Sequence, residues 1–231
     1  MEFKMMQSVL RVVLVDINPR VVDAWRSVFA NHPEVEIVRG SILHQEVDAW
    51  VTPTNALGNM DGGVDAAIKR HLGPGIEHRV QREIGQHHQG MLMVGHATCV
   101  PSGVNIPRFV ISTPTMVMSA EDISGTMNVA LACAAAFQAI HMQNEREPDS
   151  IISVAMPGLG AATGCVPART CAKLMWAGYT LFKEGTFRDF NAMRAALQSH
   201  LGEPAPMHEE VAIQIKVPGD HSDKVAPWLW Q

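Results

Sequence analysis

The sequence lacks an excess of basic residues: 18 lysines and arginines stand against 23 aspartates and glutamates, which gives a formal net charge of −5. A surface without surplus positive charge is poorly suited to a nucleic-acid backbone or an anionic membrane, so we expect neither as a partner. A small phosphorylated ligand stays compatible with this charge, because backbone N–H groups bind phosphate without help from lysine or arginine.

The sequence also lacks the patterns that indicate a metal site, a disulfide framework or a membrane span. Its four cysteines include no CxxC pair, and its eleven histidines show no zinc-ligand spacing, so we expect free thiols, no metal and no cofactor. No run approaches the ~18 apolar residues of a membrane span, and the first residues do not resemble a signal peptide. We therefore expect a cytoplasmic protein in a reducing compartment.

What the sequence does contain is an alternation of strand-like and helix-like segments. Apolar runs predict strands over residues 11–15, 35–38, 47–51, 91–99, 108–113 and 151–156. Apolar residues at helical spacing predict helices from Pro19, over 64–72, 76–84 and 122–142, and from Pro167. This alternation predicts a three-layer α/β fold.

The composition changes after Gly202, which divides the chain into a domain over residues 1–202 and a C-terminal extension over residues 203–231. Glu203–Pro206 has the composition of a linker, and the alternation over Val211–Val217 predicts an edge strand. The tail that follows carries Trp228 and Trp230, and we expect these two indoles to dock on the domain or on a partner.

Two glycine-rich segments, residues 52–65 and 157–164, each follow a predicted strand and precede a predicted helix. Glycines let backbone amides approach an anion closely, and the helix that follows adds a partial positive charge. Two such loops at one sheet edge would suit a diphosphate, although either could be a simple turn. Neither loop matches the P-loop or GxGxxG pattern, which argues against an ATPase or a Rossmann enzyme.

The segments Val47–Asn55 (VDAWVTPTN) and Gly62–Ile68 (GGVDAAI) resemble the signature of macro domains, which are ADP-ribose-binding modules. Further similarity lies at Gly40–Ile42, Val110–Pro114 and Pro157–Gly164, so the resemblance spans about residues 11–201. The MDGGVD spelling is similar to a divergent, bacterial or phage-associated branch. The resemblance implies an α/β/α sandwich around a mixed sheet of about six strands.

The resemblance also implies a role for individual residues. Asp65 would lie near C1″ of the distal ribose and orient water, and Asn55 would hydrogen-bond that ribose, which makes these two the candidate catalytic residues. The implied ligand-binding residues edge the adenine, surround the diphosphate or contact the distal ribose: Ser41, Ile42, Asn55, Gly62, Gly63, Val64, Thr113, Pro114, Gly158, Leu159, Gly160, Ala161, Ala162, Thr163 and Gly164.

Several positions depart from the family pattern. Ser41 stands where the family has an adenine-binding aspartate, so either affinity falls or Asp16 supplies the contact, unless Asp16 only caps the next helix. Asp61 replaces the first glycine of the usual three and would repel phosphate unless it points away. Ala161 and Ala162 replace the more common threonine and glycine.

The resemblance implies a protein that binds ADP-ribose or a related NAD-derived nucleotide, with ADP-ribose or an ADP-ribosylated substrate as its partner. The favoured activity is that of an ADP-ribosyl hydrolase, which breaks the bond between C1″ and an attached group. The sequence leaves two alternatives open: a non-catalytic reader or sensor of ADP-ribose, and a structural module with a degenerate pocket.

Overall fold

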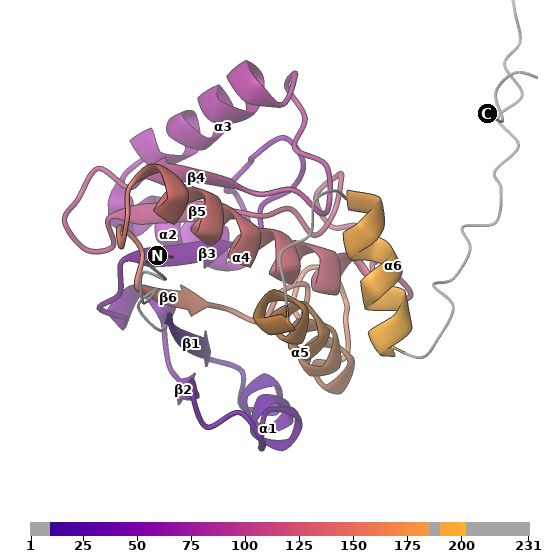
Figure 1. Cartoon of the computed structure of the whole chain (residues 1–231). Helices are drawn as coiled ribbons and strands as arrows, with labels where there is room; N and C mark the ends of the chain where they lie inside the picture. The colour runs from indigo at the N-terminus through magenta and orange to yellow at the C-terminus, as the bar shows by residue number, and fades with distance from the viewer. Residues whose placement is uncertain (1–9, 185–189, 202–231) are drawn as a thin grey trace, which may run out of the picture.

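The computed structural model describes residues 10–184 and 190–201, which fold around one six-stranded sheet (Figure 1). The strands lie in the order β2-β1-β6-β3-β5-β4, and all neighbours are parallel except β4 and β5. Their bounds are β1 Arg11–Asp16, β2 Val35–Arg39, β3 Ala49–Thr52, β4 Thr98–Pro101, β5 Phe109–Ser112 and β6 Ser153–Met156. The predicted mixed sheet of about six strands is confirmed.

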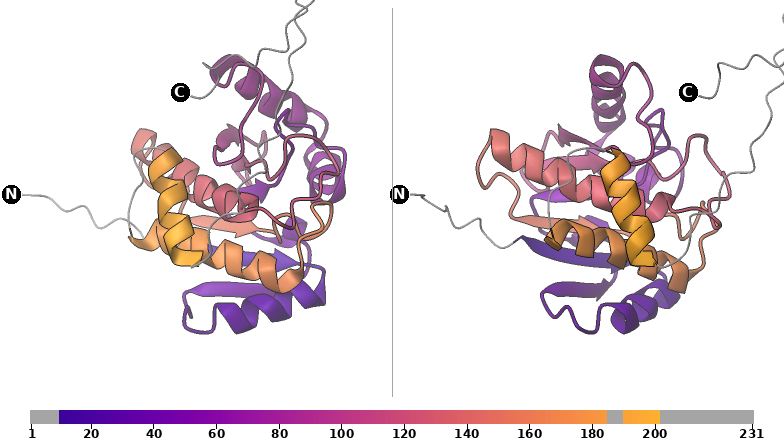
Figure 2. Two further views of the ribbon diagram at one scale, coloured as in Figure 1. Left: turned by 90° about the vertical axis from the view of Figure 1, so that its right-hand side faces the viewer. Right: turned by 45° about the vertical axis from the view of Figure 1, so that its right-hand side comes forward.

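Helices cover both faces of the sheet, as the predicted three-layer sandwich requires. Helices α2 (Gly63–Leu72) and α3 (Gly75–His87) pack on one face, and α1 (Pro19–Val28), α4 (Asn128–Arg146) and α5 (Ala168–Glu184) pack on the other. Helix α6 (Phe190–Leu201) packs across α4 and α5 (Figure 2). A short 3₁₀ turn, η1 (Ile42–His44), follows β2.

Strand β1 shows why these apolar runs form central strands. Val12 and Leu14 pack into the core beneath α1, α4 and α5, whereas Val13 and Val15 pack into the core beneath α2 and α3. A strand that is buried on both faces must be apolar at successive positions, which is the pattern of parallel sheets. The connection to α1 also follows the sequence, because the Asn18 side chain accepts a hydrogen bond from the Arg20 amide (3.0 Å) and Pro19 begins the helix.

The expected strand over residues 91–99 is wrong in its larger part, since regular pairing with β5 begins only at Thr98. Leu92 is buried while Met91 and Met93 are 42% and 51% exposed, so the alternation in this segment is real. Its cause is a single anchor: the Leu92 amide donates to the Ala56 carbonyl (2.8 Å) in the first glycine-rich loop instead of pairing with the sheet. The alternation of exposed and buried residues over 91–93 therefore comes from one buried side chain, Leu92, in a loop and not from a strand.

The expected helix over residues 122–142 begins later and ends later, as α4. Side-chain hydrogen bonds to the backbone hold residues 122–128 in turns: Asp122 accepts from the Ser124 amide (2.9 Å) and Thr126 accepts from the Asn128 amide (3.2 Å). Short polar side chains of this kind offer the backbone an alternative to a helix.

The remaining expectations are met in part or lie beyond the described residues. The four cysteines are free: Cys133 and Cys171 are buried, Cys99 is half-buried and Cys165 is exposed. Within the described residues, no helix combines the length and hydropathy needed to cross a bilayer. The predicted linker, edge strand and tryptophan tail of residues 203–231 lie outside the described part of the chain.

Candidate functional site

The two glycine-rich loops lie next to each other because the strands that precede them are neighbours. Strands β3 and β6 pair in parallel, with Ala49 opposite Val154 and Trp50 opposite Ala155, so both loops leave the same edge of the sheet. The loops meet at Gly63 and Thr163: a Cβ atom on Gly63 would lie 3.9 Å from the Thr163 hydroxyl oxygen. The carboxyl edge of a parallel sheet is where α/β proteins bind ligands.

A third loop, residues 113–127 after β5, contacts both of them. The Ala56 amide in the first loop donates to the Met116 carbonyl (3.1 Å), and the Ile123 amide donates to the Gly164 carbonyl of the second loop (3.1 Å). These two backbone hydrogen bonds fix the separation of the glycine-rich loops through a shared neighbour.

The first loop ends in backbone amides that point to no internal acceptor. Gly62 is the N-cap of α2, and Gly63 adopts a φ of +54°, a left-handed conformation that a residue with a side chain rarely takes. Within residues 10–184 and 190–201, the amides of Gly62, Gly63 and Val64 donate to no acceptor. Unpaired amides at the positive end of a helix dipole form an anion-binding arrangement.

The predicted ligand residues of the second loop form two groups: those whose amides have no internal acceptor and those whose amides or side chains make internal contacts. In the described part of the chain, the amides of Gly160, Ala162, Thr163 and Gly164 have no acceptor, whereas Ala161 donates weakly to the Gly158 carbonyl (3.4 Å). The Gly158 amide donates to the Asp16 carboxylate (3.0 Å), and the Leu159 side chain is buried in the core. The amides without an acceptor are thus those of residue 160 and residues 162–164, and of these residues Ala162 and Thr163 are exposed while Gly160 and Gly164 are buried.

Asp65 lies in the first turn of α2, and its carboxyl group points toward the end of β3. There it accepts a hydrogen bond from the hydroxyl of Thr52, a buried residue that sequence reasoning did not identify. Desolvation by burial raises the pKa of Asp65 to about 7, and the hydrogen bond from Thr52 opposes that rise. A carboxyl group with a pKa near neutrality exchanges a proton readily and is typical of a functional site.

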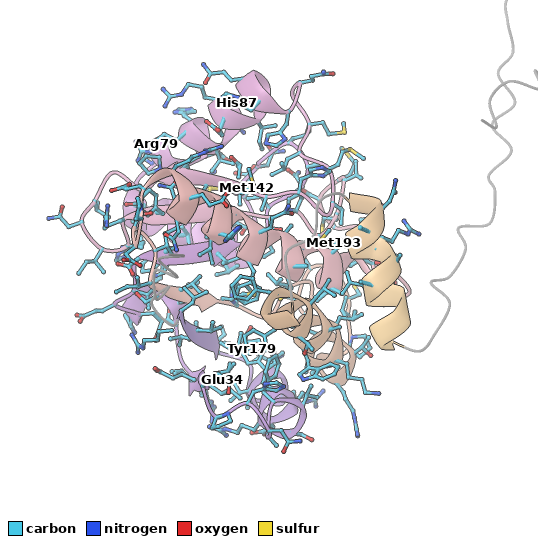
Figure 3. All side chains as sticks on the ribbon, viewed as in Figure 1. Glu34, Arg79, His87, Met142, Tyr179 and Met193 are labelled. Carbon is cyan, nitrogen blue, oxygen red and sulfur yellow. The ribbon has the colours of Figure 1, made fainter. Side chains whose placement is uncertain are left out.

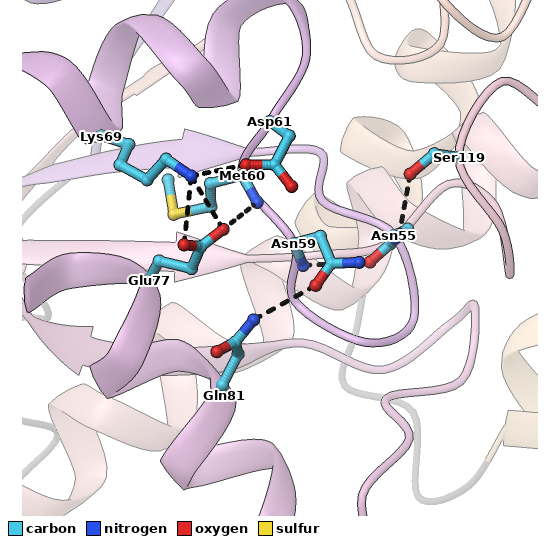
Figure 4. A network of polar contacts seen from close by, with 8 residues as sticks. All are labelled: Asn55, Asn59, Met60, Asp61, Lys69, Glu77, Gln81 and Ser119. Atoms are coloured by element: carbon cyan, nitrogen blue, oxygen red, sulfur yellow. Dashed lines mark hydrogen bonds and ion pairs between the residues drawn. The ribbon is translucent and has the colours of Figure 1, made fainter. Parts of the chain in front are cut away.

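The Asn55 side chain shapes the first loop. Its Oδ1 atom accepts from the amides of Leu57 (3.1 Å) and Asn59 (3.0 Å), and its Nδ2 atom donates to Ser119 Oγ (3.0 Å) in the third loop (Figure 4). Asn55 thereby joins two of the three loops, and its contact with a ribose stays a prediction.

Asp61 does not stand unpaired beside the loop amides. Its carboxylate is 2.6 Å from Lys69 Nζ, and Lys69 also pairs with Glu77 at 3.1 Å (Figure 4). Glu77 in turn accepts from the Met60 amide (2.7 Å), so α3 holds the loop through this carboxylate. Lys69 is therefore the cationic partner of the carboxylate that sequence reasoning expected to repel phosphate, and it shares its single positive charge between Asp61 and Glu77.

The predicted adenine and ribose contacts lie on neighbouring chain segments. The Ser41 hydroxyl accepts from the Leu43 amide (3.2 Å), and Gly40 donates to the Asp16 carbonyl (3.0 Å), which places Ser41 beside the end of β1. Asp16 accepts from the Asn18 amide (2.8 Å) as well as from Gly158, so it joins two loops. The side chains of Ile42, Thr113 and Pro114 are buried, and Thr113 donates to the Ala132 carbonyl (2.8 Å).

Four residues of this region had no signal in the sequence. Thr52, Lys69, Glu77 and Ser119 act through contacts with residues that lie 8 to 64 positions away. No spacing rule links such pairs, because the fold of the loops brings them together.

Comparisons with known proteins agree with this geometry. The family model described as "Macro domain" matches residues 51–175. An uncharacterized protein of Aquifex aeolicus is 31% identical over 142 residues, which cover 62% of this chain and 78% of the relative.

Two solved structures share the fold. The macrodomain of Mycobacterium tuberculosis DarG has a TM-score of 0.51 and 21% identity, covering 61% of this chain and 86% of that one. A mutant Oceanobacillus iheyensis macrodomain with ADP-ribose has a TM-score of 0.51 and 17% identity, covering 71% of this chain and 91% of that one.

Proposed function

The chain belongs to the macro domain family, and we propose that it binds ADP-ribose or a related NAD-derived nucleotide at the edge where its glycine-rich loops meet. The observation that carries this proposal is the proximity of Gly63 and Thr163 across the two loops, each flanked by amides without internal acceptors in the described residues. A diphosphate would accept hydrogen bonds from both sides. The solved relative with ADP-ribose supports the choice of ligand.

We further propose that the site hydrolyses the bond between C1″ of the distal ribose and an attached group. Water attacks C1″, its proton passes to the Asp65 carboxylate, and the departing group leaves with the bonding electrons and takes up a proton from solvent. Asp65 then returns its proton to solvent. Burial raises the pKa of Asp65 to about 7, so both forms of the carboxyl group are populated near neutral pH. A proton acceptor works best when its pKa lies near the working pH.

The proposal is tested with a mono-ADP-ribosylated protein as substrate and with ADP-ribose as ligand. We expect wild type to bind ADP-ribose in calorimetry and to release it from the substrate. Asp65→Asn retains an oxygen that can accept from Thr52 but has no basic carboxylate, so it should bind ADP-ribose and lose release. Tight binding by wild type without release would select the reader function instead.

The structural-module alternative has its own outcome. If ADP-ribose, NAD and AMP all fail to bind at millimolar concentration, the amides at the loop edge are not a nucleotide site. In that case both the binding proposal and the hydrolase proposal are wrong.

A further inference from the structure

A hollow lies at the open edge of the sheet, between α3 and α4 and beside β4. It is a cavity of about 480 Å³, within the usual size range of small-ligand sites. One wall carries His87 at the end of α3, and the other carries Met142 on α4 (Figure 3). We refer to this cavity as the edge groove. The residues that line it include His88, His96, Cys99, Gln138, Met142 and Arg146.

The edge groove is separate from the loops of the proposed nucleotide site. Helix α4 begins at Asn128, whose side chain donates to the Thr115 carbonyl (2.9 Å) in the third loop, and it ends at Arg146 in the edge groove. At 1.5 Å per residue, Arg146 lies about 27 Å along the helix from Asn128, and Ala135, the α4 lining residue closest to Asn128 in the chain, lies about 10 Å from it.

The lining combines an apolar floor with a basic rim. Ala135, Ala139 and Met142 recur at helical spacing along α4; the two alanines are 1% and 8% exposed and Met142 is 46% exposed, so Met142 offers most of the accessible apolar surface of these three. The amides of Gln138 and Gln143 flank this floor. A flat apolar body with a polar substituent would fit this combination.

The charges around the edge groove favour an anion. Its single lining carboxylate, Glu83, is 3.7 Å from His87 Nε2, which forms an ion pair only with the protonated imidazole. Arg146 has no carboxylate within ion-pair distance among the residues that the structure describes. Across the groove, the rings of His88 and His96 have centroids 6.5 Å apart.

These histidines do not make a metal site. In the described ranges, no three histidine, cysteine, aspartate or glutamate side chains are arranged to hold a metal ion. Burial, and then the neighbouring His96, lower the pKa of His88, because a second positive charge is unfavourable there. Burial also raises the pKa of Cys99 to about 12, so its thiol stays protonated and uncharged.

We propose that the edge groove is a binding site for a small organic anion that carries one phosphate or carboxylate group on a flat apolar body. The anionic group lies between Arg146 and the imidazoles of His88 and His96, and the apolar body lies against Met142 on α4. This site goes beyond the proposed nucleotide function and does not depend on it.

The proposal predicts that binding and protonation are coupled. The groups that face the anion are Glu83, His87 and His88 from α3, His96 from the preceding loop, Cys99 from β4 and Arg146 from α4. An anion stabilises the protonated form of His88, whose pKa burial lowers, so affinity should rise as pH falls from about 8 to about 6.

The test is a titration of the full chain with phenyl phosphate, with benzoate and with the neutral analogue benzyl alcohol. The proton NMR signals of the histidine rings monitor each titration. His88→Gln and His96→Gln assign the two signals. We expect one or both anions to shift both signals saturably at millimolar concentration, and the anion that does so identifies the phosphate or the carboxylate source. Benzyl alcohol should shift neither.

A matched pair of variants tests the local charge. Arg146→Gln should weaken anion binding at least about fivefold, whereas Arg82→Gln removes the same charge from exposed α3 surface outside the edge groove and should change it less than about twofold. The proposal is wrong if neither anion binds, if benzyl alcohol binds equally well, if both variants have the same effect, or if saturating ADP-ribose displaces the probe.

Discussion

The Thr52 hydroxyl group donates a hydrogen bond to the carboxyl group of Asp65, and this contact joins the end of β3 to the first turn of α2. The same carboxyl group sits where the helix dipole would favour its ionised form, yet its pKa is raised to about 7. Desolvation therefore outweighs the hydrogen bond from Thr52. The desolvated Asp65 carboxyl group therefore lowers the free energy of unfolding when it is charged.

The first prediction concerns the pH dependence of that stability. Since the folded-state pKa of Asp65 lies above its ordinary value of 3.8, the unfolded chain loses this proton first, and Asp65 lowers the free energy of unfolding as pH rises from about 4 to about 7. Asp65→Asn removes this loss. The stability of the variant relative to wild type should rise by up to about 1.4 kcal/mol per pH unit in that window, as measured by urea unfolding.

Asp23→Asn is the control for this series, because Asp23 lies on exposed α1 surface with 71% of its side chain accessible. Its difference from wild type should stay within about 0.5 kcal/mol at every pH. A difference between Asp65→Asn and wild type that does not change between pH 4 and 7 would contradict the buried-carboxyl assignment.

The second prediction concerns the amides at the start of α2. Gly63→Ala places a methyl group in a left-handed conformation and 3.9 Å from the Thr163 hydroxyl, at the point where the loops meet. We expect ADP-ribose affinity to fall at least about tenfold, or about 1.4 kcal/mol, in calorimetry. Gly73→Ala imposes similar backbone strain at the other end of the same helix, with open space around its Cβ. It should lose stability and keep its affinity within about twofold.

The third prediction concerns the carboxylate by which α3 holds the first loop. Glu77→Ala leaves the buried Met60 amide without its acceptor at 2.7 Å, so the free energy of unfolding should fall by about 1–3 kcal/mol. ADP-ribose affinity should fall as well, because Met60 precedes the amides of residues 62–64 by two positions. Glu145→Ala removes a mostly exposed partner of His141 and should change stability by less than about 0.5 kcal/mol. Equal effects of the two variants in thermal unfolding would argue against the role of Glu77.

The sequence predicted the elements well where local chemistry decides them. Asn18 and Pro19 mark the start of α1, and the apolar run before Pro157 marks β6, because caps and two-sided burial leave a signal in neighbouring residues. The segment around Leu92 misled the strand prediction, since a single buried anchor produces the same alternation as a strand. Periodicity records burial and does not record which backbone group is the hydrogen-bond partner.

For the candidate site, the sequence and the resemblance indicated the loops but not the contacts that hold them. The pairing of Lys69 with Asp61 and Glu77 depends on how α2 and α3 pack, which no short-range pattern encodes. The same holds for Asp16 and Gly158, which are 142 residues apart in the chain. Long-range polar contacts follow from the three-dimensional fold, so only the structure could reveal them.

The last prediction concerns Gly178, which lets α5 approach α4 closely in the core. A Cβ atom at this position would lie 2.8 Å from the Cys133 Cβ and 2.9 Å from the Ala130 carbonyl oxygen, and a backbone atom cannot yield as a flexible side chain can. Alanine is ordinarily the better helix former by about 1 kcal/mol, but the clash should prevail and lower the free energy of unfolding by about 1–3 kcal/mol. Gly85→Ala, inside α3 with nothing within 4 Å of its Cβ, isolates the helix preference and should raise stability by about 0.5–1 kcal/mol. Urea unfolding of the two variants should therefore give opposite signs, and a stabilised Gly178→Ala would show that α4 and α5 are not packed this closely.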